Sequence, residues 1–102
     1  EYEALAKANE NSWRILFSIA NVFSYNEYFK EAIQMWQKTF DCMPKPRYTD
    51  SFEAMAQCCV RMGDHESAVE YYKKELELLR EDWGLKYGAE VDALGEKIRA
   101  LQ

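Results

Sequence analysis

The sequence predicts an all-α fold: a right-handed helix-turn-helix solenoid of about two and a half repeats in 102 residues. The first observation is a near-repeat at a shift of 36 residues, which places small residues on small ones and large apolar residues mostly on large ones. The matched pairs are Leu16 with Phe52, Ile19 with Met55, Ala20 with Ala56, Ala32 with Ala68, Ile33 with Val69, Trp36 with Tyr72 and Phe40 with Leu76. The second is that apolar residues recur at the 3.6-residue period of an α-helix. The third is a composition of only four glycines and two prolines, which favours long helices over a turn-rich β fold.

Length and composition predict a single globular domain over 1–102, with 48% apolar and 30% charged residues. The net charge of −5 and a pI near 4.9 disfavour a nucleic-acid partner, whose phosphates need a basic surface. No apolar run approaches the roughly 18 residues of a membrane span, and no signal peptide is visible. We therefore expect no membrane partner and a cytoplasmic location, with a nuclear one also possible. Because the chain starts at Glu1 without a methionine, we expect an excerpt or a processed product.

The first predicted helical pair runs from Trp13 to Pro46, as repeat 1 (13–46). Its first apolar stripe is Trp13, Leu16, Ile19, Ala20 and Phe23, and its second is Phe29, Ala32, Ile33, Trp36, Phe40 and Met43. A break at 24–26 separates the two, with Ser24 and Asn26 as candidate caps. Pro44 stops the second helix, and Pro46 prevents it from resuming.

The second pair forms repeat 2 (49–82) and begins near a cap at Thr49 or Asp50. Its stripes are Phe52, Met55, Ala56, Cys59 and Met62, then Ala68, Val69, Tyr72, Leu76 and Leu79. Gly63 turns the chain in a left-handed conformation, and the next helix runs from about His65 to Glu81. Glu75 stands where the first repeat has Thr39, a position that favours a small residue. We expect its carboxylate to reach solvent or the edge of the pair.

Incomplete repeats are expected at both ends of the chain. Residues 88–102, with the stripe Val91, Leu94, Gly95 and Ile98, read as the first helix of a third repeat or a cap. Residues 1–10, with Tyr2, Leu5 and Ala6, read as a helix of a truncated preceding repeat.

These residues resemble the tetratricopeptide repeat family over about 90 residues. The matching run is Phe52-xx-Met55-Ala56-xx-Cys59-xxx-Gly63-Asp64-xxx-Ala68-xxx-Tyr72, which is echoed by Leu16-xx-Ile19-Ala20-xx-Phe23, Ala32-xxx-Trp36 and Pro44, and by Val91-xx-Leu94-Gly95-xx-Ile98. The repeat of 36 residues departs from the family's usual 34. The longer second helix of repeat 2 is similar to the extended repeats of Pins-type adaptors, Tonsoku-like proteins and kinesin light chains.

The resemblance implies a scaffold that binds a partner peptide in a concave groove lined by the first helix of each repeat. Carried over position by position, the lining residues are Arg14, Phe17, Asn21, Tyr25, Asp50, Glu53, Gln57, Arg61, Asp92, Glu96 and Arg99. Phe17 and Tyr25 are the aromatic members. Phe17 is either a hot-spot anchor for the ligand or a packing residue against the missing helix of the preceding repeat.

The character of this lining predicts the charge of the ligand. Members of the resembling family that hold a ligand carboxylate use lysines, arginine and asparagine. Asn21 matches one of those positions, but Phe17 stands where a lysine is expected and Ala54 where an asparagine is expected, and a carboxylate would meet Glu53. We therefore do not expect a carboxylate-binding site. The acidic residues Asp50, Glu53, Asp92 and Glu96 instead favour a protein partner that carries lysine or arginine beside apolar residues.

Catalytic, cofactor and metal sites are not expected. The glycines Gly84 and Gly88 follow no predicted strand, and His65 is the only histidine that could act as a base for a cysteine nucleophile. The thiols of Cys42, Cys58 and Cys59 lack zinc-site spacing and are expected to be reduced and buried.

Two alternatives to groove binding stay open. In the first alternative, the chain is a slice of a longer array or an assembly subunit. It would then self-associate through its ends, by way of the apolar face of Val91, Leu94 and Ile98. Alternatively it is an RNA-binding helical repeat of the pentatricopeptide type, which the acidic lining disfavours.

Overall fold

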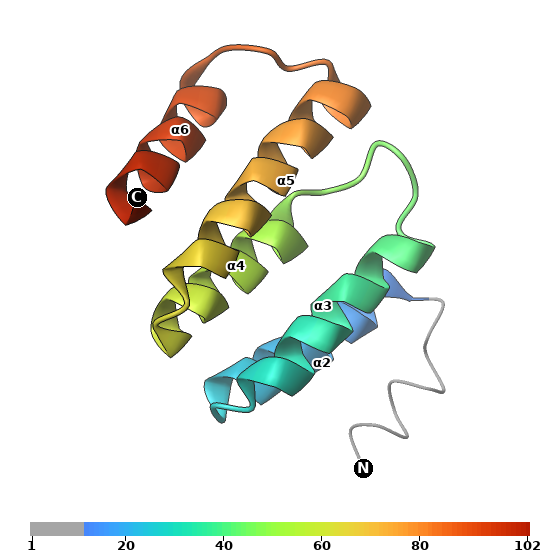
Figure 1. Ribbon diagram of the computed structural model, residues 1–102. Helices are drawn as coiled ribbons and strands as arrows, with labels where there is room; N and C mark the ends of the chain where they lie inside the picture. The colour runs from blue at the N-terminus through green and yellow to red at the C-terminus, as the bar shows by residue number, and fades with distance from the viewer. Residues whose placement is uncertain (1–11) are drawn as a thin grey trace. The chain divides into compact units, whose positions relative to one another are not determined.

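The computed structural model describes residues 12–102, and over this range the chain is all-helical, which confirms the predicted all-α class. Five helices follow in order (Figure 1): α2 (Trp13–Tyr25), α3 (Phe29–Cys42), α4 (Asp50–Met62), α5 (His65–Trp83) and α6 (Ala89–Leu101). The helix predicted within 1–10 lies outside the described residues. The chain divides into two compact units, one ending at Pro44 and one running from Lys45 to Gln102. We call them the N-terminal and the C-terminal unit.

In the N-terminal unit, α2 and α3 form an antiparallel pair (Figure 1). Ala20 and Ala32 are both 0% exposed, so the absence of bulky side chains at these positions lets the two helices approach closely. Asn26 ends α2, and both its backbone N–H and its side-chain amide donate to the carbonyl of Val22. The helix α3 ends at Cys42, two residues before Pro44, as predicted.

In the C-terminal unit, α5 packs against both α4 and α6 (Figure 1). Gly63 caps α4 with a φ of 81°, the left-handed conformation that the sequence predicts there. Asp64 caps α5, because its carboxylate accepts a hydrogen bond from the backbone N–H of Ser67 at 3.2 Å. The core of this unit is formed by Ala56, Val69, Tyr72, Leu79, Leu94 and Ile98.

Two details differ from the sequence-based expectation. The helix α5 continues two residues beyond Glu81, to Trp83, because the left-handed Gly84 is the residue that ends it. In α6, Leu94 and Ile98 are only 4% and 8% exposed, because they pack into the core of the C-terminal unit. These two side chains are therefore not part of a free apolar end face.

The three cysteines are free thiols. Cys58 and Cys59 are buried free thiols, and burial is the main cause that raises the pKa of Cys59 to about 11. Cys42 is also a free thiol but only partly buried. Among the described helices, none has the length and apolar character needed to cross a membrane.

Candidate functional site

The predicted groove residues of the N-terminal unit all lie on α2, three or four residues apart, and therefore on one face of that helix. Arg14 and Asn21 are exposed, and Tyr25 is 86% exposed. The Arg14 guanidinium lies over the Trp13 ring, 5.1 Å from the ring centroid. Three of the four residues thus offer their side chains to solvent within this unit.

Phe17 is the exception, since it is partly buried inside the helical pair. Its ring centroid lies 6.4 Å from that of Trp36 on α3 and 6.5 Å from that of Trp13. Both separations fall in the range of tilted and edge-to-face aromatic contacts. Packing against Trp36 of the same pair is a role that the sequence analysis did not consider. It gives Phe17 a structural partner within the described residues.

On α4, the predicted lining residues Asp50, Glu53, Gln57 and Arg61 again share one face. Asp50, Gln57 and Arg61 are exposed, whereas Glu53 is partly buried. The Gln57 amide donates to Oε1 of Glu53 at 3.4 Å, and Nζ of Lys97 on α6 lies 3.4 Å from the same oxygen. Glu53 is therefore the member of this stripe that joins α4 to α6.

A pocket of about 280 Å³ lies next to this ion pair. It is lined by residues of three helices and the segment before α4: Thr49, Glu53, Glu75, Leu79, Glu90, Ala93, Leu94 and Lys97. Glu53 is the predicted groove residue that lines it. Asp92, Glu96 and Arg99 are exposed on α6 and do not line it, because α6 turns the neighbouring side, with Glu90, Ala93, Leu94 and Lys97, toward the pocket.

Glu75 corrects the expectation that its carboxylate reaches solvent or an edge. The residue is only 5% exposed, and its Oε1 is buried without a hydrogen-bond partner among the described residues. The reason is that α5 is covered by both α4 and α6, whereas Thr39, at the equivalent position, satisfies its hydroxyl locally by donating to the carbonyl of Trp36. An ionised glutamate in the same place cannot donate to such a carbonyl, and Oε1 of Glu75 has no partner among the described residues.

The pKa of Glu75 is raised from 4.5 to about 7, mainly by burial, since the charged form loses its hydration. The neighbouring carboxylate of Glu53 contributes to this rise, Lys97 opposes it, and Asp50 and Glu90 add to it. The carboxyl group is therefore partly ionised near neutral pH. A buried acid that titrates in this range and lines a pocket is the type of group that often marks a functional site.

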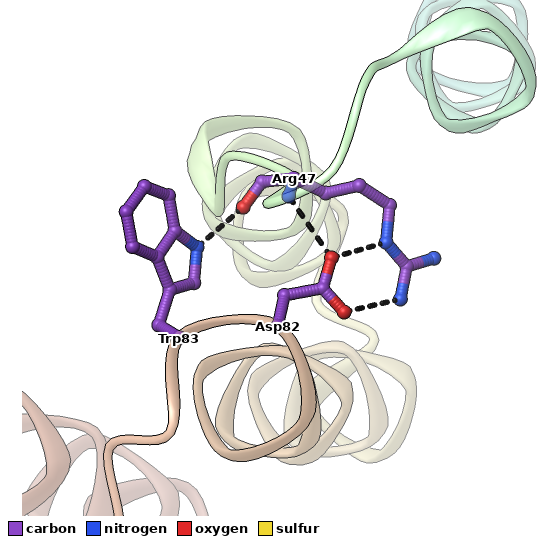
Figure 2. A network of polar contacts seen from close by, with 3 residues as sticks. All are labelled: Arg47, Asp82 and Trp83. Carbon is purple, nitrogen blue, oxygen red and sulfur yellow. Dashed lines mark hydrogen bonds and ion pairs between the residues drawn. The ribbon is translucent and has the colours of Figure 1, made fainter.

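A polar network holds the segment before α4 against the end of α5 (Figure 2). Asp82 Oδ2 accepts from the backbone N–H of Arg47 at 2.9 Å and from its Nε at 2.7 Å, and Oδ1 accepts from Nη2 at 3.1 Å. The indole of Trp83 donates to the carbonyl of Arg47 at 2.6 Å. Hydrogen bonding to Arg47 lowers the pKa of Asp82 to about 2. This network positions Thr49, two residues later, at the rim of the pocket.

Sequence reasoning missed Glu75, Glu90 and Lys97 as site residues. Glu75 carried a signal, because a glutamate replaces threonine at an otherwise apolar or small position of the repeat. Glu90 and Lys97 carried no such signal, because charged residues on an amphipathic helix are typical of its solvent-exposed face. Their proximity to Glu75 depends on how α6 packs on α5.

No group of histidine, cysteine, aspartate and glutamate side chains within 12–102 is arranged to hold a metal ion. A comparison of the sequence with protein-family models found no match, and neither did a comparison with curated proteins.

Proposed function

We propose that this chain is a protein-binding scaffold built from tetratricopeptide-like repeats. In this proposal the α2–α3 and α4–α5 pairs are two repeats, α6 is the first helix of a third, and the repeats stack as a right-handed solenoid. Support comes from the two antiparallel pairs and from the four alanines at matched positions, Ala20, Ala32, Ala56 and Ala68, which are all 0% exposed. The first helices of the repeats would line a concave groove that receives a partner peptide.

The observation that carries the function is the acidic pocket next to the α4 stripe. Its lining holds three carboxylates and one ammonium group, so its charge is negative when all four are ionised. Such a surface attracts a ligand with lysine or arginine by electrostatic complementarity. We infer a partner protein that carries basic and apolar residues, and we propose no catalytic role and no nucleic-acid partner.

Peptide display against the whole chain tests this function, with a pair of charge-reversal variants. Glu53→Lys reverses the charge between α4 and α6, and Glu77→Lys makes the same change at an exposed position of α5 that does not line the pocket. We expect selected peptides to be rich in lysine or arginine and to bind the wild type and Glu77→Lys but not Glu53→Lys. Peptides without basic residues, or equal binding to both variants, would refute the groove proposal.

The stacking of the two pairs has its own test. Asn21 and Gln57 occupy equivalent positions one repeat apart, so stacked repeats place them on neighbouring helices whose axes are about 10 Å apart. Cysteines at these two positions, in a Cys42→Ser background, should be joined efficiently by a crosslinker of similar length. Cross-linking no better than for the pair Asn21 and Glu77 would argue against the solenoid.

Association through the ends of the array remains a second proposal. Leu94 and Ile98 are buried in the core, so α6 would have to contribute its polar side to such a contact. A molecular mass that rises with protein concentration in sedimentation would support it.

A further inference from the structure

The pocket between α4, α5 and α6 is lined by more carboxylates than cations. The Lys97 ammonium is already engaged, with Glu53 Oε1 at 3.4 Å and the Tyr72 ring centroid at 5.6 Å. Glu75 lines the same pocket, is 95% buried as a residue, and keeps Oε1 without a partner among the described residues. A buried carboxylate oxygen without a hydrogen-bond partner is unfavourable, so a cation that enters the pocket and donates to it is stabilised.

The pocket has the size and lining of a site for one side chain. Its volume of about 280 Å³ is below the roughly 300–1,000 Å³ typical of sites for drug-sized ligands. Leu79, Ala93 and Leu94 supply an apolar wall, which suits the methylene stem of a long basic side chain. Glu75 and Glu90 supply carboxylates for its charged end. A guanidinium fits better than an ammonium, because its planar set of donors can serve two carboxylate oxygens at once.

We propose that this pocket receives a single arginine side chain of the partner protein, with Glu75 as its main counter-ion. The inference rests on the proposed function, because it takes the arginine to belong to the bound peptide. It goes beyond that function by naming the residue type recognised and the side chain that recognises it. Lys97 stays paired with Glu53 at the rim, and the incoming guanidinium donates to the Glu75 oxygen that has no partner among the described residues.

Binding of the arginine is expected to depend on pH. Glu75 faces Asp50 and Glu53 from α4, Glu90 and Lys97 from α6, and Tyr72 on its own helix. With a pKa of about 7, the ionised fraction of Glu75 rises from about a tenth at pH 6 to about nine-tenths at pH 8. Only the ionised form attracts the guanidinium, so the affinity should rise about tenfold over this range.

The experiment is an NMR titration of the whole ¹⁵N-labelled chain with capped arginine, N-acetyl-arginine methylamide. Capped citrulline, its neutral isostere, is the matched control ligand, and capped lysine and putrescine are further arms. We expect saturable amide shifts in α4, α5 and α6 with capped arginine, weaker ones with capped lysine and none with capped citrulline. Equal shifts with capped citrulline would overturn the proposal. Tighter binding of putrescine would overturn the assignment to a protein side chain.

Variants then test the role of Glu75. Glu75→Gln should weaken capped-arginine binding at pH 8 by about tenfold or more and remove its pH dependence. The control Glu77→Gln, on the exposed side of the same helix, should leave both unchanged. Unchanged affinity in Glu75→Gln, or an affinity that is flat between pH 6 and pH 8 in the wild type, would refute the inference.

The two proposals fail in different ways. If displayed peptides lose binding to Glu53→Lys but bind Glu75→Gln as well as the wild type, the groove stands and the arginine pocket is wrong. If capped arginine binds through Glu75 while no displayed peptide binds the chain, the pocket stands and the scaffold function is wrong.

Discussion

Replacing Glu75 with glutamine should make the protein more stable at neutral and alkaline pH but not at pH 5. The pKa of Glu75 is raised to about 7 in the folded protein, from an ordinary value of 4.5, so the folded state holds this proton more tightly than the unfolded state does. Stability from this group is therefore fully present below pH 4.5 and is lost as the pH rises through 7. Each unit of pKa difference corresponds to about 1.4 kcal/mol.

Between pH 5 and pH 8 the linkage amounts to about 2 to 3 kcal/mol lost from the free energy of unfolding. Because Glu75 is 5% exposed, solvent screens this effect little. Glutamine has nearly the same shape and no charge, so Glu75→Gln should match the wild type at pH 5 and exceed its stability by about 2 to 3 kcal/mol at pH 8.

Urea denaturation followed by circular dichroism at the two pH values measures this difference. Glu77→Gln, at an exposed position of the same helix, is the control and should show no pH-dependent difference from the wild type. If Glu75→Gln and the wild type differ by the same amount at pH 5 and pH 8, Glu75 titrates normally and the reasoning is wrong. A gain confined to pH 5 would contradict the sign of the shift.

Three further predictions concern packing and the polar network. Ala68→Leu should destabilise the protein by about 1–3 kcal/mol in urea denaturation, because the residue is 0% exposed and a larger side chain has to displace its neighbours. A change near zero would contradict close helix packing. Phe17→Ala should lower the free energy of unfolding by about 2 kcal/mol, because the contact with Trp36 is lost. An unchanged midpoint of urea denaturation would contradict this packing role. Asp82→Asn should lower the melting temperature at pH 7, since Asp82 has a lowered pKa and its ionised form binds Arg47. That difference from the wild type should shrink as the pH falls from 4 toward 2, where about half of the Asp82 carboxylates become protonated, and a difference as large at pH 2 as at pH 7 would contradict the role of the ion pair.

The helices were predictable because their signals are local. Apolar stripes at helical spacing, Pro44 after α3 and Gly63 after α4 each act through the few residues beside them, and each helix end lies within about two residues of its expected place. The alanines at matched positions of the repeat also predicted which residues would be buried between the helices of a pair.

The candidate site was predictable only in part. Glu53 lines the pocket, but the groove on which it was expected stays a prediction. Glu75 was expected to reach solvent or an edge and is buried. Glu90 and Lys97 were not singled out, because spacing along α6 does not show which side of the helix meets α5. Phe17 was expected either to bind a ligand or to pack on a preceding repeat, and it contacts Trp36 of its own pair.

The acidic charge and the helices of residues 12–102, including the two helical pairs, follow from the sequence, since helix periodicity and capping depend on neighbours within a turn or two. The packing of α4 and α6 on α5 around Glu75, which leaves its carboxylate buried beside Glu53, Glu90 and Lys97, depends on the three-dimensional fold. The physical reason is that hydration and counter-charge depend on what lies within a few ångströms in space. For Glu75 those neighbours come from residues 15 or more positions away along the chain.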